Sequence, residues 1–149
     1  MAAVRRSSGL PLSEQEASDR RRALEGWGSL FNAVGWSGCA AAETAAQEPT
    51  EAERDESLAA VLAKKATGTL FARLSQVRLF HAWASTLGGV ETLPIAEPAA
   101  YAYTRHLVNA KAPASRADSF RSAVAFLKYT CGMPGADAVL QSGRVTGKA

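Results

Sequence analysis

Apolar side chains recur at intervals of three and four residues along most of this chain, which is the pattern of amphipathic helices. The clearest example opens at Pro113 and Ser115, and its apolar stripe comprises Ala117, Phe120, Val124, Leu127 and Cys131. No segment alternates with a period of two for long enough to predict a strand. The sequence therefore predicts an all-α protein.

Further helices are predicted from the same spacing, at residues 14–34, 51–65, 70–87, 98–110 and 136–142. Ser13 and Glu16 have the spacing of a capping box at the start of the first of these helices. Thr50 is the predicted N-cap of the second. That helix ends in Lys64 and Lys65, which carry the charge that the helix dipole favours at a C-terminus.

The hydrophobic core is expected between the helix at 70–87 and the helix that opens at Pro113. Their regularly spaced apolar residues include Leu74, Val77, Trp83, Phe120, Val124 and Leu127. Residues 35–49 are dominated by turn formers and small residues, so they are predicted to be a linker or mobile loop. The first helix is then expected to be peripheral to the bundle.

The composition fits one compact domain with a tail, because 149 residues with 47% apolar content suffice for a core. No apolar run is long enough for a membrane span, and the N-terminal residues lack the apolar centre of a signal peptide. An intracellular protein that is not secreted is therefore expected. Cys39 and Cys131 belong to no C-x-x-C motif or His/Cys cluster, so free thiols are expected and neither a metal nor a cofactor is predicted.

Charge is distributed unevenly along the chain, whose net charge is +3. Residues 1–66 carry eight Lys/Arg against ten Asp/Glu, a net charge of −2, whereas residues 67–149 carry nine against four, a net charge of +5. Clustered cations of this kind are compatible with a polyanionic partner. Ordinary helical domains also show differences of this size.

Lysines and threonines mark the entry to the helix that contains "LSQVRLFHAWA", and a proline-containing connection, "YAYTRHL" and "ASRADSFRSAVAFLKYTCGM" follow it. This order resembles the N-terminal core-binding, SAM-like domain of tyrosine recombinases and phage-type integrases. The resemblance covers about residues 64–147. It rests on a pattern of apolar anchors and caps, without an invariant chemical signature.

The resemblance implies a small orthogonal bundle of four to five helices, here with an additional N-terminal helix, that forms one jaw of a clamp around DNA. The implied domains are an N-terminal helix and mobile linker at 1–49, the DNA-binding bundle at 50–143, and the start of an interdomain linker or tail at 144–149. In that family a separate domain performs the strand cleavage.

Catalysis by this chain itself is not expected. The family's catalytic domain supplies arginines, a His-x-x-Arg element and a tyrosine nucleophile, whereas here His81 is followed at the third position by Ala84 and His106 by Asn109. A self-contained enzyme is also disfavoured, because no paired carboxylates, activated nucleophile or phosphate-cradling glycine loop can be assembled. His81 falls in an apolar stripe, so a packed core histidine is favoured over a metal ligand or a base.

The resemblance implies DNA contacts from cations and hydroxyls near two helix starts, namely Lys64, Lys65, Thr67, Thr69, Arg73, Arg116, Arg121 and Lys128. The chain departs from the family at Ala125, where a basic residue is frequent, and at Arg121, where a neutral one is more usual. For Lys64, Lys65, Thr67 and Thr69, the alternative is that they only cap helices and complement the helix dipole. For Arg116, Arg121 and Lys128, the alternative is that their long side chains form a rim around the core. The run "DRRRALE" is compatible with a nucleic-acid arm, but a solvated helix face is the favoured interpretation.

Together these observations predict a core-binding-type domain, belonging to or derived from a tyrosine recombinase, that grips duplex DNA mainly through phosphates. A catalytic recombinase domain or other protomers are further expected partners, with no membrane and no small-molecule substrate. A DNA-binding role implies a nuclear or nucleoid-associated location. The alternative function is a helical protein-interaction module derived from the same bundle.

Overall fold

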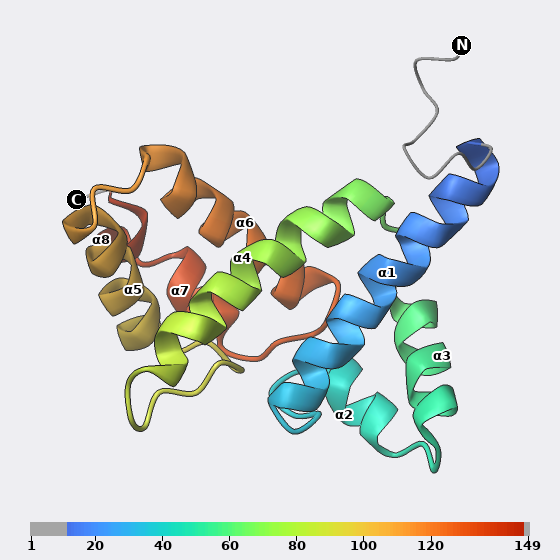
Figure 1. Ribbon diagram of the computed structural model, residues 1–149. Helices are drawn as coiled ribbons and strands as arrows, with labels where there is room; N and C mark the ends of the chain where they lie inside the picture. The colour runs from blue at the N-terminus through green and yellow to red at the C-terminus, as the bar shows by residue number, and fades with distance from the viewer. Residues whose placement is uncertain (1–11, 148–149) are drawn as a thin grey trace.

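The computed structural model describes residues 12–147, and every regular element in this range is helical (Figure 1). The prediction of an all-α protein is confirmed. The helices of this range are α1 (Leu12–Ala33), α2 (Ala40–Ala46), α3 (Glu51–Leu62), α4 (Thr67–Ser85), α5 (Glu97–Asn109), α6 (Ala114–Tyr129), α7 (Ala136–Leu140) and α8 (Gly143–Thr146). The structure corrects the expectations about the loop at residues 35–49, about some of the helix caps and about the tail.

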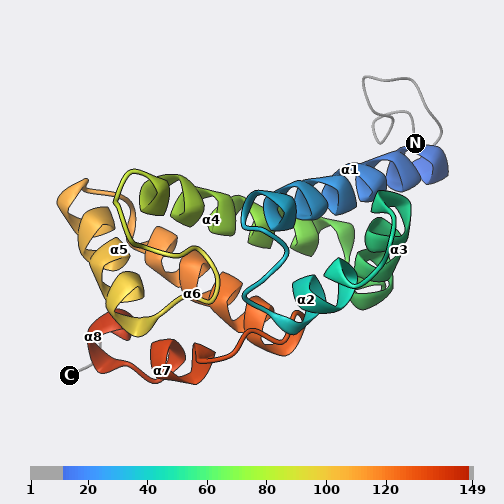
Figure 2. The same cartoon turned by 90° about the horizontal axis from the view of Figure 1, so that it is seen from below.

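The centre of the molecule is formed by α4 and α6, which run in opposite directions and cross (Figures 1 and 2). Phe80, near the end of α4, stacks on Phe120, near the start of α6, with ring centroids 5.5 Å apart. The expected core residues are buried, with one exception. Trp83 is half-buried at the edge of the core, where its ring lies beside Tyr103 and His106 of α5.

Helix α1 is part of the core, and the expectation that the first helix is peripheral is wrong. Trp27 and Phe31 are fully buried. The indole of Trp27 stacks on Phe126 of α6 at 5.2 Å, and its Nε1 donates a hydrogen bond of 3.0 Å to the backbone carbonyl of Leu70 on α4. The apolar stripe of α1 therefore packs against both α4 and α6.

Gly26 explains how α1 comes so close to α4. A Cβ added at this position would lie 2.5 Å from Cδ2 of Leu74, which is closer than real Cβ atoms approach. The glycine thus permits close packing of the two helices, and α1 continues through it without a break. The cost of a glycine in a helix interior, about 0.5–1 kcal/mol relative to alanine, is offset by this contact.

Residues 40–46 form helix α2, where the sequence predicts a linker or loop without regular structure. The backbone N–H groups of Ala40 and Ala41 donate to the carbonyls of Gly132 and Cys131, so the first amides of α2 meet the carbonyls that follow α6. Each set of groups would otherwise lack a helical partner. This alanine-rich segment has no amphipathic period, so the spacing of apolar residues does not predict its helix.

The last described residues form α7 and α8, which lie beside α6 and α5 (Figure 2). Residues 143–146 are helical, whereas the sequence predicts a linker or tail from residue 144. Val145 is buried and Arg144 binds Glu97 of α5 through two hydrogen bonds of 2.6 and 2.7 Å, so α8 is held on the bundle. The remainder of that predicted tail, residues 148 and 149, lies outside the described residues.

Candidate nucleic-acid interface

A cleft of about 310 Å³ lies where the start of α4 passes the end of α6, and it contains three of the predicted DNA-binding residues. We call it the α4–α6 groove, lined by Lys65, Thr69, Arg73, Ser122, Ala125, Phe126, Tyr129 and Thr130. Thr69 and Arg73 are four residues apart on α4 and share one helix face, and Lys65 lies just before α4. No acidic residue belongs to the lining.

The N-terminus of α4 opens toward solvent without a capping side chain. Its N-cap is Ala66, so the alternative prediction of a threonine N-cap at this end is wrong. Gly68 in the first turn is exposed, and a Cβ added there would meet no atom within 4 Å. First-turn amides carry partial positive charge and lack helical acceptors. This helix end is therefore open to solvent on its Gly68 side.

Thr67 lies in a network that joins three helices, and its side chain is turned away from solvent. The residue is 8% exposed, and its hydroxyl donates a hydrogen bond of 2.7 Å to Oε1 of Glu16 on α1. Glu16 therefore serves this contact, and Ser13 lies inside α1, so the predicted capping box is wrong. Thr67 has a structural role here.

Arg20 of α1 closes the C-terminal end of α3. Its guanidinium donates hydrogen bonds to the carbonyls of Leu62 at 2.7 Å, Ala63 at 3.2 Å and Lys65 at 2.5 Å. Carbonyls at a helix end lack helical donors and carry partial negative charge, so a cation is favoured there. The expectation of a simple solvated face holds for the exposed Arg21 and is wrong for Arg20.

Lys64, Lys65 and Arg73 belong to no ion pair within residues 12–147. Both lysines are exposed, and Arg73 is half-buried. Their charges are thus available to an external anion. In addition, Lys65 and Arg73 are the two cations of the α4–α6 groove, whereas Lys64 does not line it.

The other predicted cations do not line the groove, and two of them are ion-paired. Burial raises the pKa of Tyr103 and the nearby Arg116 guanidinium opposes this rise; Arg116 belongs to no ion pair within residues 12–147. Arg121 pairs with Asp118 and Lys128 with Asp137, and the hydrogen bond to Asp137 raises the pKa of the Lys128 ammonium. Because α4 and α6 are antiparallel, their N-termini lie at opposite ends of the pair. A surface made of both helix starts together is not present.

Tyr129 is a groove residue that the sequence reasoning missed. It is 74% exposed, lines the α4–α6 groove, and lies beside Lys128, whose Nζ is 4.5 Å from the ring centroid. Its position in the sequence falls outside the apolar stripe of α6. Its place on the polar face of the helix could have identified Tyr129 from the sequence, because core packing does not account for an aromatic side chain there.

Other kinds of site find little support in the described part of the chain. Residues 12–147 contain no group of three or more His, Cys, Asp or Glu that could hold a metal ion. His81 is half-buried and hydrogen-bonds Thr92. Cys39 and Cys131 are buried free thiols, and burial raises the pKa of both. Among the helices of this range, none combines the length and the apolarity required to cross a membrane.

Comparisons of the chain with protein-family models, with curated proteins and with solved structures find no match.

Proposed function

We propose that this chain is a DNA-binding domain that holds duplex DNA at the α4–α6 groove and has no catalytic activity of its own. The observation that carries the proposal is the set of Lys65, Thr69 and Arg73 beside an uncapped helix N-terminus, without an acidic residue in the lining. Cations, hydroxyls and helix N-termini are the groups that proteins use on phosphates.

The DNA backbone lies along the start of α4 in this proposal. Lys65 and Arg73 neutralise phosphates, and the hydroxyls of Thr69, Ser122 and Tyr129 donate hydrogen bonds to phosphate oxygens. The polar face of α6 then offers limited contact with base edges. Binding is therefore mainly electrostatic, and it depends weakly on sequence.

The resemblance to core-binding domains of tyrosine recombinases supports the same helices as the DNA-binding pair. We infer that the chain belongs to or derives from such a recombinase, that a catalytic recombinase domain or other protomers are partners, and that it acts where DNA is located, in a nucleus or nucleoid. The structural corrections to α1, α2 and α8 leave the helices of the groove unchanged.

The test is titration of labelled duplexes of several sequences with the full chain at low and moderate salt. Each neutralised phosphate contributes about 0.9 to the slope of log affinity against log salt. Lys65→Gln with Arg73→Gln should weaken binding to all duplexes and reduce this slope by roughly 2. Arg54→Gln with Arg105→Gln removes the same charge from other surfaces and should change the slope far less.

Two results would contradict the proposal. One is a parent protein that binds no duplex even at low salt, where weak non-specific binding in the range of about 10⁻⁴ to 10⁻⁶ M is expected to be measurable. The other is equal loss of affinity in both double variants, which would indicate an effect of net charge alone. In either case the protein-interaction module becomes the favoured function.

A further inference from the structure

The described chain has two ends of opposite charge. Residues 12–62 carry four Lys/Arg against ten Asp/Glu, a net charge of −6, and residues 63–147 carry ten against four, a net charge of +6. Figures 1 and 2 both place α3 at one end of the elongated molecule and α5 and α8 at the other. The acidic side chains of α3 and the cations of α5 and α8 therefore lie at opposite ends of the molecule, whereas Lys64 and Lys65 directly follow α3.

The acidic end contains a groove of about 410 Å³ between α1 and α3, which we call the acidic groove; Glu25, Gly28, Ser29, Asn32, Trp36, Glu51, Arg54 and Asp55 line it. Glu51 and Asp55 lie four residues apart on α3, where like charges repel. No acidic side chain of α3 belongs to an ion pair within residues 12–147. An external cation would relieve this repulsion.

Trp36 gives the acidic groove an aromatic side chain at its surface. It is half-buried, and its backbone φ of +54° is uncommon for a bulky residue. The ring packs at 6.0 Å from Phe31, and Nε1 donates to Asn32 over 3.3 Å. Tryptophan is enriched among the residues that dominate binding energy at protein interfaces.

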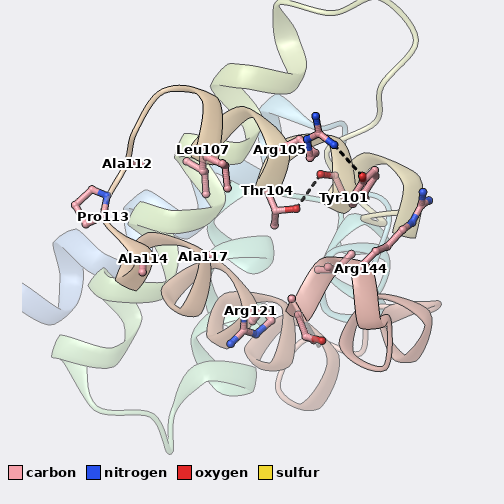
Figure 3. Close-up of a pocket in the computed structure, with 14 residues that line it drawn as sticks. Tyr101, Thr104, Arg105, Leu107, Ala112, Pro113, Ala114, Ala117, Arg121 and Arg144 are labelled. Atoms are coloured by element: carbon pink, nitrogen blue, oxygen red, sulfur yellow. Dashed lines mark hydrogen bonds between the residues drawn. The ribbon is translucent and has the colours of Figure 1, made fainter. Parts of the chain in front are cut away.

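The basic end contains a cleft of about 210 Å³ between α5, α6 and α8, which we call the arginine cleft (Figure 3). Arg105, Arg121 and Arg144 surround a largely apolar lining that includes Leu107, Val108, Ala117 and Val145. Arg121 and Arg144 each pair with a carboxylate of the same chain. Arg105 hydrogen-bonds only the Tyr101 hydroxyl among described residues, and its charge is not balanced by a carboxylate.

Two more features of the arginine cleft suit contact with another protein surface. Val108 is 70% exposed beside Arg105, so an apolar side chain lies within the basic surface. Lys111, at the turn that follows α5, is exposed and belongs to no ion pair within residues 12–147. The cleft thus offers an apolar contact flanked by two cations without carboxylate partners.

We propose that copies of this chain associate head to tail, with the acidic groove of one copy against the arginine cleft of the next. The two surfaces are complementary in charge, each carries an apolar side chain, and they lie at opposite ends of one molecule. A contact between two different patches is heterologous, so it leads to rings or open chains of copies. This inference is independent of DNA binding.

The experiment is sedimentation equilibrium of the full chain without DNA, over protein concentrations up to hundreds of micromolar. At about 20 mM salt the Debye length is roughly 20 Å, and the average mass should rise above the 15.7 kDa of one chain as concentration increases. At about 0.5 M salt, with a Debye length of roughly 4 Å, the mass should return to that of one chain. A single-chain mass at every concentration in low salt would overturn the proposal.

Charge reversal identifies the surfaces. Arg105→Glu with Lys111→Glu puts acidic side chains at both contact surfaces, and Glu51→Lys with Asp55→Lys puts basic side chains at both, so each double variant alone should remain a single chain. An equimolar mixture of the two restores opposite charges at the contact and should associate again. Failure of the mixture to associate, or association of either variant alone as strong as the parent's, would overturn the assignment.

Circular dichroism and the unfolding midpoint show whether each variant is folded before the mixture is measured. If one variant is unfolded, Glu51→Gln with Asp55→Gln and Arg105→Gln with Lys111→Gln replace the reversals. Each neutral pair should lower the association constant at low salt at least tenfold. An association constant within twofold of the parent's would overturn the proposal.

Discussion

The two clefts that flank α6 both contain arginines, but the α4–α6 groove and the arginine cleft differ in the state of those charges. Lys65 and Arg73 in the groove belong to no ion pair within residues 12–147, and the groove has no acidic lining. In the arginine cleft, Arg121 and Arg144 are bound to carboxylates, and Arg105 has no carboxylate partner within residues 12–147. The two clefts therefore differ in how many of their cations are paired internally, and this difference can be tested against phosphate binding.

The largest expected effect comes from the core beneath the groove. Trp27→Ala should lower the free energy of unfolding by about 3–5 kcal/mol, because it removes a fully buried indole that packs on Phe126 and hydrogen-bonds the Leu70 carbonyl. Trp83→Ala is the control, since Trp83 is half-buried. Denaturant unfolding measures both, and equal losses would show that α1 is no more central than the edge of the core.

The second prediction compares free with paired cations directly. Arg121→Gln with Lys128→Gln removes two charges that are already paired with Asp118 and Asp137, so the salt slope of duplex binding should fall by less than about 1. Lys65→Gln with Arg73→Gln removes the same charge and should lower it by roughly 2. Equal slopes from salt titrations of both variants would show that internal pairing does not decide which cations meet DNA.

The smallest effect concerns the ion pair that holds α8 on α5. The hydrogen bond from Arg144, helped by one from Ser142, lowers the pKa of Glu97 from 4.5 to about 2. Since the folded pKa lies below the ordinary value, this stabilisation is complete above about pH 4.5 and is lost as the pH falls toward 2. Unfolding midpoints of the parent should therefore approach those of Glu97→Gln over this range. A constant difference between the two proteins down to pH 2 would contradict the ion pair.

The sequence predicts those parts of the fold that depend on local spacing. The predicted stripe that begins at Ala117 is buried except at Ala117 itself, which is half-buried, and Thr50 caps α3, with its hydroxyl accepting from the Glu53 amide at 3.1 Å. Helix α2 is missed because a run of alanines shows no polar face. The contact from Arg20 to the end of α3 is missed because its partners lie more than forty residues away.

The groove is predictable only on its α4 side. Thr69 and Arg73 share one face of α4 because they are four residues apart, which is visible in the sequence, and Lys65 lies just before the helix begins. Tyr129 joins them only because α4 and α6 cross in opposite directions. Arg121 pairs with Asp118 at the i,i+3 spacing of one helix, which is visible in the sequence, whereas Lys128 meets Asp137 of α7 only through the packing of the two helices.

The hydrogen bonds between the start of α2 and the carbonyls after α6 also bear on how the chain folds. Ala41 and Cys131 are joined by a 2.9 Å hydrogen bond across ninety positions of the sequence. Contacts of such wide separation slow folding, because a long loop must close before they form. During synthesis, the first helices therefore cannot complete their packing until residue 132 has left the ribosome, so the N-terminal third depends on the last third for its final structure.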